Sequence, residues 1–204
     1  TYSSLVSALA GAERVFEILD TPNETDEGKT TLVRLLKNAL GEEEETDLPQ
    51  GKLAWKVPED NGFRYVPLKG NIEVKDVTFA YVEGNDVLKN IDVTANSGHK
   101  VAFVGSTGAG KTTITNLINR FYDIDSGRIT IDGIDVKDIK RECLRKNIAM
   151  VLQDTHLFTG TVMENIRYGR PDATMEEIIE AAKKAEIYDD IMEMPHGFDT
   201  YVGE

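Results

Sequence analysis

The eight residues from Gly105 to Thr112 read Gly-Ser-Thr-Gly-Ala-Gly-Lys-Thr and carry the strongest chemical signal in the sequence. Their spacing, a Gly, four residues, Gly-Lys and then Thr, is the pattern of a phosphate-binding loop. Glycines let such a loop curl so that successive backbone N–H groups point at an anion. In this pattern Lys111 would reach the β- and γ-phosphates of a nucleotide, and the hydroxyl of Thr112 would hold Mg²⁺. The alternative is a glycine-rich turn followed by a chance Lys-Thr.

The segments on either side of the loop decide between these interpretations. The apolar run Lys100–Val104 predicts a buried strand that enters the loop, and Thr113–Phe121 predicts a helix that leaves it. The N-terminus of that helix would add partial positive charge beside the phosphates. Both flanks favour the phosphate site over a chance turn. The apolar face of the helix would comprise Ile114, Leu117, Ile118 and Phe121.

A second stretch, Gly28-Lys29-Thr30-Thr31, copies only the end of the same pattern. The residue five positions before Gly28 is Asn23, and no strand leads into it. We therefore expect no ligand there and predict a helix from Thr30 to Leu40 instead. Its apolar face would comprise Leu32, Leu35, Leu36 and Leu40.

Length, charge and composition limit the possible classes of protein. The chain has 204 residues, of which 40% are hydrophobic and 29% charged, which is enough for one globular domain and part of another. Its net charge of −13 argues against a nucleic-acid-binding surface. The single cysteine excludes an internal disulfide and suits a reducing compartment. No apolar run reaches the length of a membrane span.

The first 70 residues divide into a helix and a connector. Residues 1–20 carry apolar side chains at helical spacing, and Asp20-Thr21-Pro22 would end that helix. Residues 21–70 are the least regular part of the chain, and we expect an extended acidic linker there. Its four consecutive glutamates, Glu42–Glu45, predict a solvated turn or tether. Short strands are expected within this linker at Lys52–Val57 and at Phe63–Pro67.

The remainder, residues 71–204, has the pattern of strands and helices that is typical of a folded domain. Thr161-Val162-Met163-Glu164 and Thr174-Met175-Glu176-Glu177 both have capping-box spacing, so a helix should begin at each. Strands are expected over residues 72–79, 87–94, 128–131 and 148–152.

Several segments around the phosphate loop occur in the order in which the motifs of one protein family follow each other. Phe79-Ala80-Tyr81 resembles the aromatic loop of an ABC transporter ATPase domain of the exporter type, and Val151-Leu152-Gln153-Asp154 resembles its Q-loop. Thr200-Tyr201-Val202-Gly203-Glu204 is similar to the start of the exporter X-loop. Residues 7–16 resemble the stretch that joins the last transmembrane helix to the ATPase domain. The resemblance covers residues 1–20 and 71–204.

This resemblance implies an α/β fold, namely a partial P-loop NTPase of ABC type with an antiparallel β subdomain and the start of the helical subdomain. It implies ATP and Mg²⁺ as ligands. The ring of Tyr81 would stack on adenine, since every base has a π-face, although a ring packed on the core would look the same in sequence. Gln153 would contact Mg²⁺ and the attacking water, so Lys111 and Gln153 are the catalytic candidates and Thr112 and Gln153 the metal ligands. The ATP-binding residues would be Tyr81, Gly105, Ser106, Thr107, Gly108, Ala109, Gly110, Lys111, Thr112 and Thr113.

The family pattern continues beyond what these residues contain. The signature motif Leu-Ser-Gly-Gly-Gln, the Walker B aspartate, the catalytic glutamate and the switch histidine are not in this sequence. We therefore interpret residues 71–204 as the N-terminal part of the ATPase domain. The complete protein would be an ATP-driven exporter on the cytoplasmic face of the cell membrane. Its ATPase domain would pair with a second one, identical or related, and residues 154–158 and 200–204 would face the coupling helices of a transmembrane domain.

Other functions compete with this interpretation. The site could bind ATP without hydrolysing it, as a regulatory module or as the degenerate site of a heterodimeric transporter. A soluble P-loop GTPase or kinase would need an Asn-Lys-x-Asp motif or a lid, and neither is visible in the sequence. A soluble ABC protein of DNA repair or translation is disfavoured by residues 1–20 and by the acidic charge.

Overall fold

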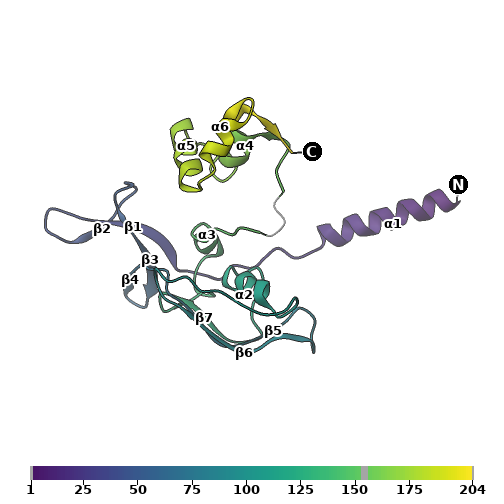
Figure 1. Ribbon diagram of the computed structural model, residues 1–204. Coiled ribbons are helices and arrows are strands. Elements are labelled where there is room, and N and C mark those ends of the chain that lie inside the picture. Colours follow the sequence, from purple (N-terminus) through teal and green to yellow (C-terminus); the bar gives the residue numbers. More distant parts are fainter. Residues whose placement is uncertain (1, 153–155, 204) are drawn as a thin grey trace. The chain divides into compact units, whose positions relative to one another are not determined.

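The computed structural model describes residues 2–152 and 156–203, which fall into two compact units, Thr1–Ala149 and Met150–Glu204 (Figure 1). The first element of the first unit is helix α1, Tyr2–Leu19, as predicted. It ends where Asp20-Thr21-Pro22 was expected to end it, and the backbone N–H of Asp20 donates to Phe16 at 2.8 Å. Across the described residues, no helix is both long and apolar enough to cross a bilayer.

The predicted linker holds an antiparallel sheet with strand order β2-β1-β3-β4. Its strands β3, Lys52–Glu59, and β4, Gly62–Pro67, confirm the two short strands expected there. The predicted helix from Thr30 to Leu40 is wrong, because β1, Thr31–Lys37, pairs with β3. The expectation of an irregular, extended segment is therefore wrong for much of 21–70. The glutamates do remain exposed, and β2, Glu43–Glu45, is an edge strand.

The helix prediction over Thr30–Leu40 failed because its leucines do not share one buried face. Leu35 is buried, whereas Leu40 lies in the turn after the strand and is 84% exposed. Strand pairing places Leu32 opposite Trp55, whose side chain is 1% exposed. Tertiary burial against this ring outweighs the helical spacing of the leucines.

A second antiparallel sheet, of strand order β6-β5-β7-β8, forms the rest of the first unit. It comprises β5, Ile72–Ala80; β6, Asp86–Ala95; β7, Ser126–Ile131; and β8, Ile134–Asp135. The strands expected over 72–79, 87–94 and 128–131 are confirmed. Helix α2, Lys111–Ile118, lies over one face of this sheet, and α3, Arg141–Arg145, follows it (Figure 1). The shared core comprises Trp55, Val74, Val77, Phe79, Leu88, Ile114, Leu117, Ile129, Ile131, Ile134, Val136, Ile139 and Leu144.

Two predicted strands are absent. Residues 100–104 and 148–152 have no strand conformation, and Val104 and Val151 are 96% and 94% exposed. A buried strand needs neighbouring strands to satisfy its backbone groups. Within the described ranges, no named strand pairs with either run. The apolar composition was correctly recognised, but the sheet that would bury it is not formed by these residues.

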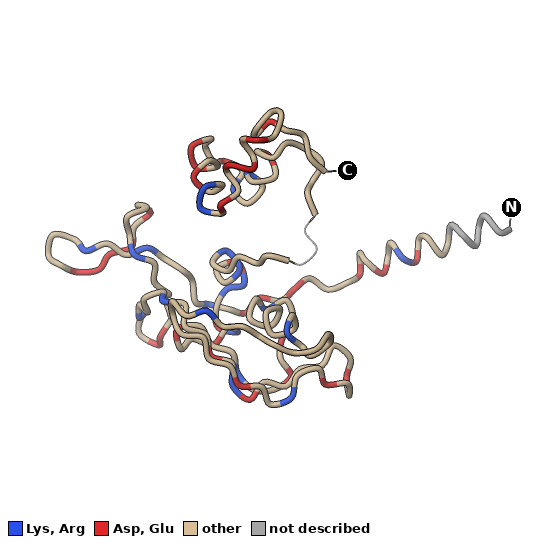
Figure 2. The backbone as a smooth tube through the Cα atoms, viewed as in Figure 1, with Lys and Arg blue, Asp and Glu red and all other residues tan. Residues whose placement is uncertain are grey.

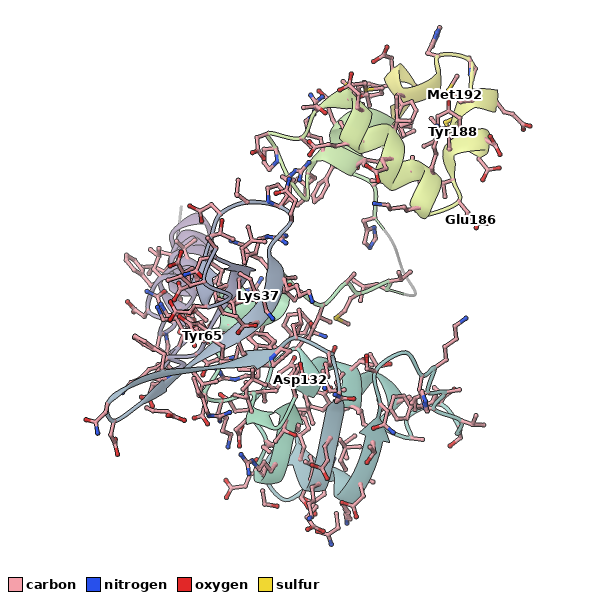
Figure 3. All side chains as sticks on the ribbon, turned by 90° about the vertical axis from the view of Figure 1, so that its left-hand side faces the viewer. Lys37, Tyr65, Asp132, Glu186, Tyr188 and Met192 are labelled. Carbon is pink, nitrogen blue, oxygen red and sulfur yellow. The ribbon has the colours of Figure 1, made fainter. Side chains whose placement is uncertain are left out.

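The carboxylate of Asp132 joins the two sheets of the first unit (Figure 3). It accepts the indole N–H of Trp55 at 3.2 Å and the backbone N–H groups of Lys69, Gly70 and Asn71 at 2.9–3.1 Å. Burial by itself would raise the pKa of Asp132, but these donors hold it below its ordinary value. The ionised carboxylate thus fixes the crossing from β4 to β5.

The second unit is a small helical body. Strand β9, Gly160–Thr161, leads into α4, Val162–Arg167, and pairs with β10, Tyr201–Val202. Both predicted capping boxes are confirmed, at Thr161 for α4 and at Thr174 for α5. Ile178, Ala182, Ile191 and Phe198 form the core. The other elements are α5, Met175–Lys184; α6, Tyr188–Glu193; and a 3₁₀ turn, Gly197–Asp199.

We expect Asp132→Asn to destabilise the first unit by about 1–3 kcal/mol at pH 7, because the amide replaces a charged acceptor of several N–H groups. The pKa of Asp132 is lowered in the folded state, so its contribution is present above the unfolded pKa of about 3.9 and is lost as pH falls below it. The difference between variant and parent should therefore shrink toward pH 3.

Urea unfolding followed by the fluorescence of Trp55, the only tryptophan, measures this difference. The matched control is Asp47→Asn, since Asp47 is an exposed aspartate in the connection between β2 and β3. An equal loss of stability at pH 7 and pH 3 would show that Asp132 acts through shape rather than charge.

Candidate functional site

The loop from Gly105 to Thr112 has the backbone conformation that its sequence predicts. Gly108 and Gly110 have φ values of 83° and 80°, in the left-handed region that favours glycine. The backbone N–H of Ala109 donates to Ser106 at 3.2 Å and closes a turn. A Cβ at Gly110 would come within 2.5 Å of Leu88 Cδ2, so the loop end fits tightly against β6. The residues from Gly105 to Ala109, including Thr107, are exposed.

Lys111 points into the concave side of this loop. Its Nζ donates to the carbonyl oxygens of Gly105 at 2.8 Å and Ser106 at 2.7 Å. These carbonyls occupy the role that phosphate oxygens would take, since both are acceptors for an ammonium group. Thr112, in the first turn of α2, is exposed, so its hydroxyl is accessible to a metal ion.

The N-terminus of α2 offers the remaining donors for an anion. Within the described chain its N-cap, Gly110, provides no side-chain hydrogen bond, so the first N–H groups of the helix are left to a ligand. The positive end of the helix, the Lys111 ammonium and the glycine turn lie in one short segment. The residues present therefore fit a nucleoside triphosphate with its Mg²⁺.

Tyr81 lies beside this loop, as the proposed adenine contact requires. Its hydroxyl donates to Thr113 Oγ1 at 3.1 Å, so the residue that follows β5 is tied to the first turn of α2. Tyr81 is 47% exposed, whereas Phe79 is 3% exposed, and the two rings are in edge-to-face contact with centroids 4.9 Å apart. Tyr81 therefore packs against the core and is also partly open to solvent. Stacking on a base stays a prediction.

Gln153, the other catalytic and metal-binding candidate, lies outside the described residues, as do Asp154 and Thr155. The structure thus brings together Tyr81, Thr113 and the loop of Lys111, and it leaves the position of Gln153 undefined. The next described residue is His156, in the second unit.

Sequence reasoning missed a charged cluster behind α2. Arg141, which is 6% exposed, donates to the carbonyl oxygen of Arg120 at 2.6 Å and to Glu24 Oε1 at 2.9 Å. Arg145 donates to both carboxylate oxygens of Glu24, at 2.7 and 2.9 Å. Basic residues gather at α3 in Figure 2, beside the segment that precedes β1. The i, i+4 spacing of two arginines in a short helix was the available signal.

The cluster connects the segment after α1 with the C-terminal end of the phosphate-loop helix. Arg145 also donates to the carbonyl of Asn119 at 3.2 Å. The guanidinium groups of Arg145 and Arg141 thus bind the carbonyls of Asn119 and Arg120, which directly follow α2. The hydrogen bond from Arg145 lowers the pKa of Glu24, against a smaller opposing effect of burial, and the charges of Arg141 and Arg145 lower it further. Glu24 is therefore ionised at neutral pH.

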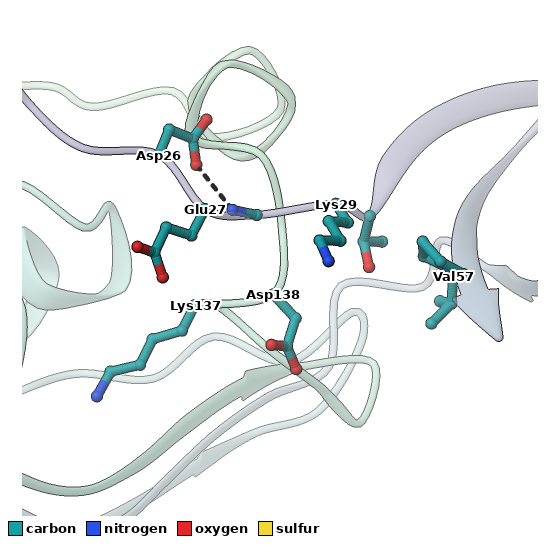
Figure 4. Close-up of a pocket in the computed structure, with 9 residues that line it drawn as sticks. Asp26, Glu27, Lys29, Val57, Lys137 and Asp138 are labelled. Atoms are coloured by element: carbon teal, nitrogen blue, oxygen red, sulfur yellow. Dashed lines mark hydrogen bonds between the residues drawn. The ribbon is translucent and has the colours of Figure 1, made fainter. Parts of the chain in front are cut away.

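The partial copy of the loop motif has a structural role in this fold. Thr30 is 1% exposed and forms a parallel bridge with Ile139, while a Cβ on Gly28 would meet the Ile139 carbonyl at 2.3 Å. An open groove of about 830 Å³ lies here, lined by side chains of both charges, and Asp26 accepts the N–H of Gly28 at 3.3 Å (Figure 4). Gly28 thus permits the close approach of two backbones, and none of the groove's lining residues belongs to the 105–112 loop.

The second unit has an apolar groove of about 440 Å³, which is lined in part by residues 156–158. The β9–β10 pair brings the start of the X-loop to this groove, and a Cβ on Gly203 would lie 2.9 Å from the carbonyl of Phe158. Leu157, Phe158 and Tyr201 are 59–68% exposed. Two segments predicted to face a membrane domain therefore form one surface. The lining residues are His156, Leu157, Phe158, Val162, Asn165, Ile166, Ile187, Asp190, Ile191, Met194 and Val202.

Comparison with known proteins agrees with the resemblance found in the sequence motifs. Over residues 88–199 the chain matches the family model described as ABC transporter. It is 42% identical over 201 residues to a fatty acid ABC transporter ATP-binding/permease protein of Mycobacterium tuberculosis, with 98% of this chain and 27% of that protein covered. It is 38% identical over 202 residues to an ATP-dependent lipid A-core flippase of Syntrophus aciditrophicus, with 99% and 28% covered.

Among solved structures, a bacterial Atm1-family ABC exporter with ATP bound resembles the whole chain, with a TM-score of 0.67 and 32% sequence identity. The match covers 100% of this chain and 30% of that one. The chain thus spans less than a third of the length of these relatives. Since the family model matches more than half of the chain and agrees with the observed loop, the chain belongs to the ABC transporter family.

Proposed function

We propose that this chain is the ATP-binding part of an exporter, and that the complete protein uses ATP binding and hydrolysis to move a substrate across a membrane. The observation that carries this proposal is the hydrogen bond from Tyr81 to Thr113, because it places an exposed aromatic ring beside the phosphate loop. Base and phosphates of one nucleotide could then be bound by adjacent groups. The similarity to a transporter, a flippase and an exporter supports the transport part of the proposal.

In this proposal, Lys111 exchanges its two carbonyl partners for phosphate oxygens and offsets the charge of the transferring phosphoryl group. The N–H groups from Ser106 to Thr113 orient the phosphates, and Thr112 would hold Mg²⁺, which supplies further positive charge. Gln153 would contact the metal and position the attacking water. The protein's contribution is thus positioning and electrostatics, as in other phosphoryl transfers.

The partners follow from the same assignment. A second ABC ATPase domain, identical or related, would close over the nucleotide. The apolar groove of the second unit and the exposed residues beside it would receive a coupling helix of a transmembrane domain, at the cytoplasmic face of the cell membrane. No nucleic acid is expected as a partner, given the net charge of −13.

Replacing Lys111 tests the nucleotide site. In the complete protein we expect Lys111→Ala to lower the ATPase rate by about 100-fold or more, because it removes the positive charge at the γ-phosphate. The matched control is Lys29→Ala in the partial motif copy, since Lys29 is an exposed lysine that likewise lies between a glycine and a threonine. The assay is phosphate release at saturating Mg-ATP. Equal rates for Lys111→Ala and the parent would contradict the site.

A cross-linking experiment tests the membrane-facing surface. Cysteines introduced at Leu157 or Tyr201, both well exposed, should form cross-links to cysteines in the cytoplasmic loops of the complete transporter. Met192→Cys is the control, because Met192 is 55% exposed but does not line the groove. Gel mobility under oxidising conditions reports the cross-link. Cross-linking at Met192 but not at Leu157 or Tyr201 would place the coupling surface elsewhere.

These 204 residues alone should hydrolyse ATP at no useful rate. Lys111 and Thr112 supply charge and a metal ligand, but no residue of the sequence matches the Walker B aspartate or the catalytic glutamate. Phosphate release by the purified chain, with Lys111→Ala as the background, measures this. Turnover that depends on Lys111 and equals that of the complete transporter would show that the chain holds a catalytic base of its own.

A further inference from the structure

Tyr122 contacts Tyr81 and is not part of the family motifs recognised in the sequence. The two ring centroids lie 5.0 Å apart with an interplanar angle of 87°, an edge-to-face contact. Both rings also contact Phe79, at 4.9 Å from Tyr81 and 5.8 Å from Tyr122. Phe79 is buried, whereas Tyr81 and Tyr122 are each 47% exposed. The three rings form a cluster that is anchored in the core at one ring and open to solvent at the other two.

The backbone next to Tyr122 is fixed to the strand that carries Tyr81. The carboxylate of Asp125 accepts the backbone N–H of Ala80 at 2.8 Å, and the N–H of Asp125 donates to the carbonyl of Thr78 at 3.2 Å. These bonds join the segment after α2 to the last residues of β5. Tyr122 therefore lies at a defined place relative to the residue before Tyr81.

The other side of Tyr122 is held by the arginine cluster. Arg120 is 6% exposed, has a φ of 52°, and donates to the carbonyls of Val136 and Ile139 at 3.1 and 3.3 Å. Asp123 forms ion pairs with Arg120 at 3.3 Å and Arg141 at 2.9 Å. The residues two before and one after Tyr122 are thus bound to buried guanidinium groups, so the backbone that carries Tyr122 is held on both sides of it.

Tyr81 follows the end of its strand and, like Tyr122, is 47% exposed. An aromatic side chain that must stack on a base pays less entropy on binding when its orientation is already fixed. The hydroxyl of Tyr81 is held by its hydrogen bond to Thr113. The edge-to-face contact with Tyr122 restricts the ring from the side, where the hydroxyl bond does not act.

We propose that Tyr122 is a positioning residue that holds the ring of Tyr81 in the orientation that receives the nucleotide base. This rests on the proposed function, since it needs Tyr81 to contact the base. It assigns Tyr122 to base binding and not to phosphate binding. Loss of Tyr122 should therefore weaken the binding of ligands that carry a base and leave the affinity for a base-free triphosphate unchanged.

The test measures the affinity of the complete protein for Mg-ATP and for Mg-tripolyphosphate by titration calorimetry. We expect Tyr122→Leu to weaken ATP binding by about two- to tenfold, the range of an aromatic pair contact, with tripolyphosphate binding unaffected. Tyr122→Phe keeps the ring and should restore parental ATP affinity. The matched control is Phe121→Leu, since Phe121 is equally exposed but contacts Arg145 rather than Tyr81.

The double variant with Tyr81→Ala distinguishes positioning from direct contact. If Tyr122 acts through Tyr81, Tyr122→Leu adds no further loss in the Tyr81→Ala background. Independent losses that multiply, an equal loss for tripolyphosphate, or no loss at all would each overturn the inference. Failure of the parent protein to bind Mg-ATP would overturn the proposed function itself, so the two failures can be told apart.

Discussion

The buried guanidinium of Arg141 is the interaction on which the first unit depends. It donates to Thr25, Glu24, Arg120 and Asp123 at 2.6–3.0 Å, so one side chain joins the segment after α1, the end of α2 and the turn before β7. Burial of a charge is costly unless its donors are paired, and here each nitrogen has an acceptor. Any shift of these segments would leave donors of a buried cation unpaired.

This constraint reaches the nucleotide site through α2. The phosphate loop with Lys111 lies at the start of α2, and Arg141 and Arg145 donate to the carbonyls that follow its end. Positively charged side chains therefore lie at both ends of the helix. Glu24, in the segment after α1, binds both Arg141 and Arg145, so that segment is connected to the end of the helix that follows the loop.

Local signals in the sequence were sufficient for several elements. The glycine spacing of 105–112 predicted a curled loop, in which Gly108 and Gly110 are left-handed, and both predicted capping boxes formed at Thr161 and Thr174. These features depend on contacts within a few residues. The runs 100–104 and 148–152 were predicted as strands on apolar composition alone, yet a strand exists only where neighbouring strands supply its hydrogen bonds. The relatives are more than three times as long as this chain, so most of their residues have no counterpart in it.

The sequence by itself indicated the family, the phosphate-loop pattern with Lys111 and Thr112, and the aromatic candidate Tyr81, because these features are encoded in short spacings. Only the tertiary structure decided that residues 31–67 form a sheet, since the leucines of β1 also fit a helix until Trp55 is placed opposite them. It also revealed the cluster around Arg141 and the contact between Tyr122 and Tyr81. Those contacts join residues far apart in the chain, and no local pattern specifies such distances.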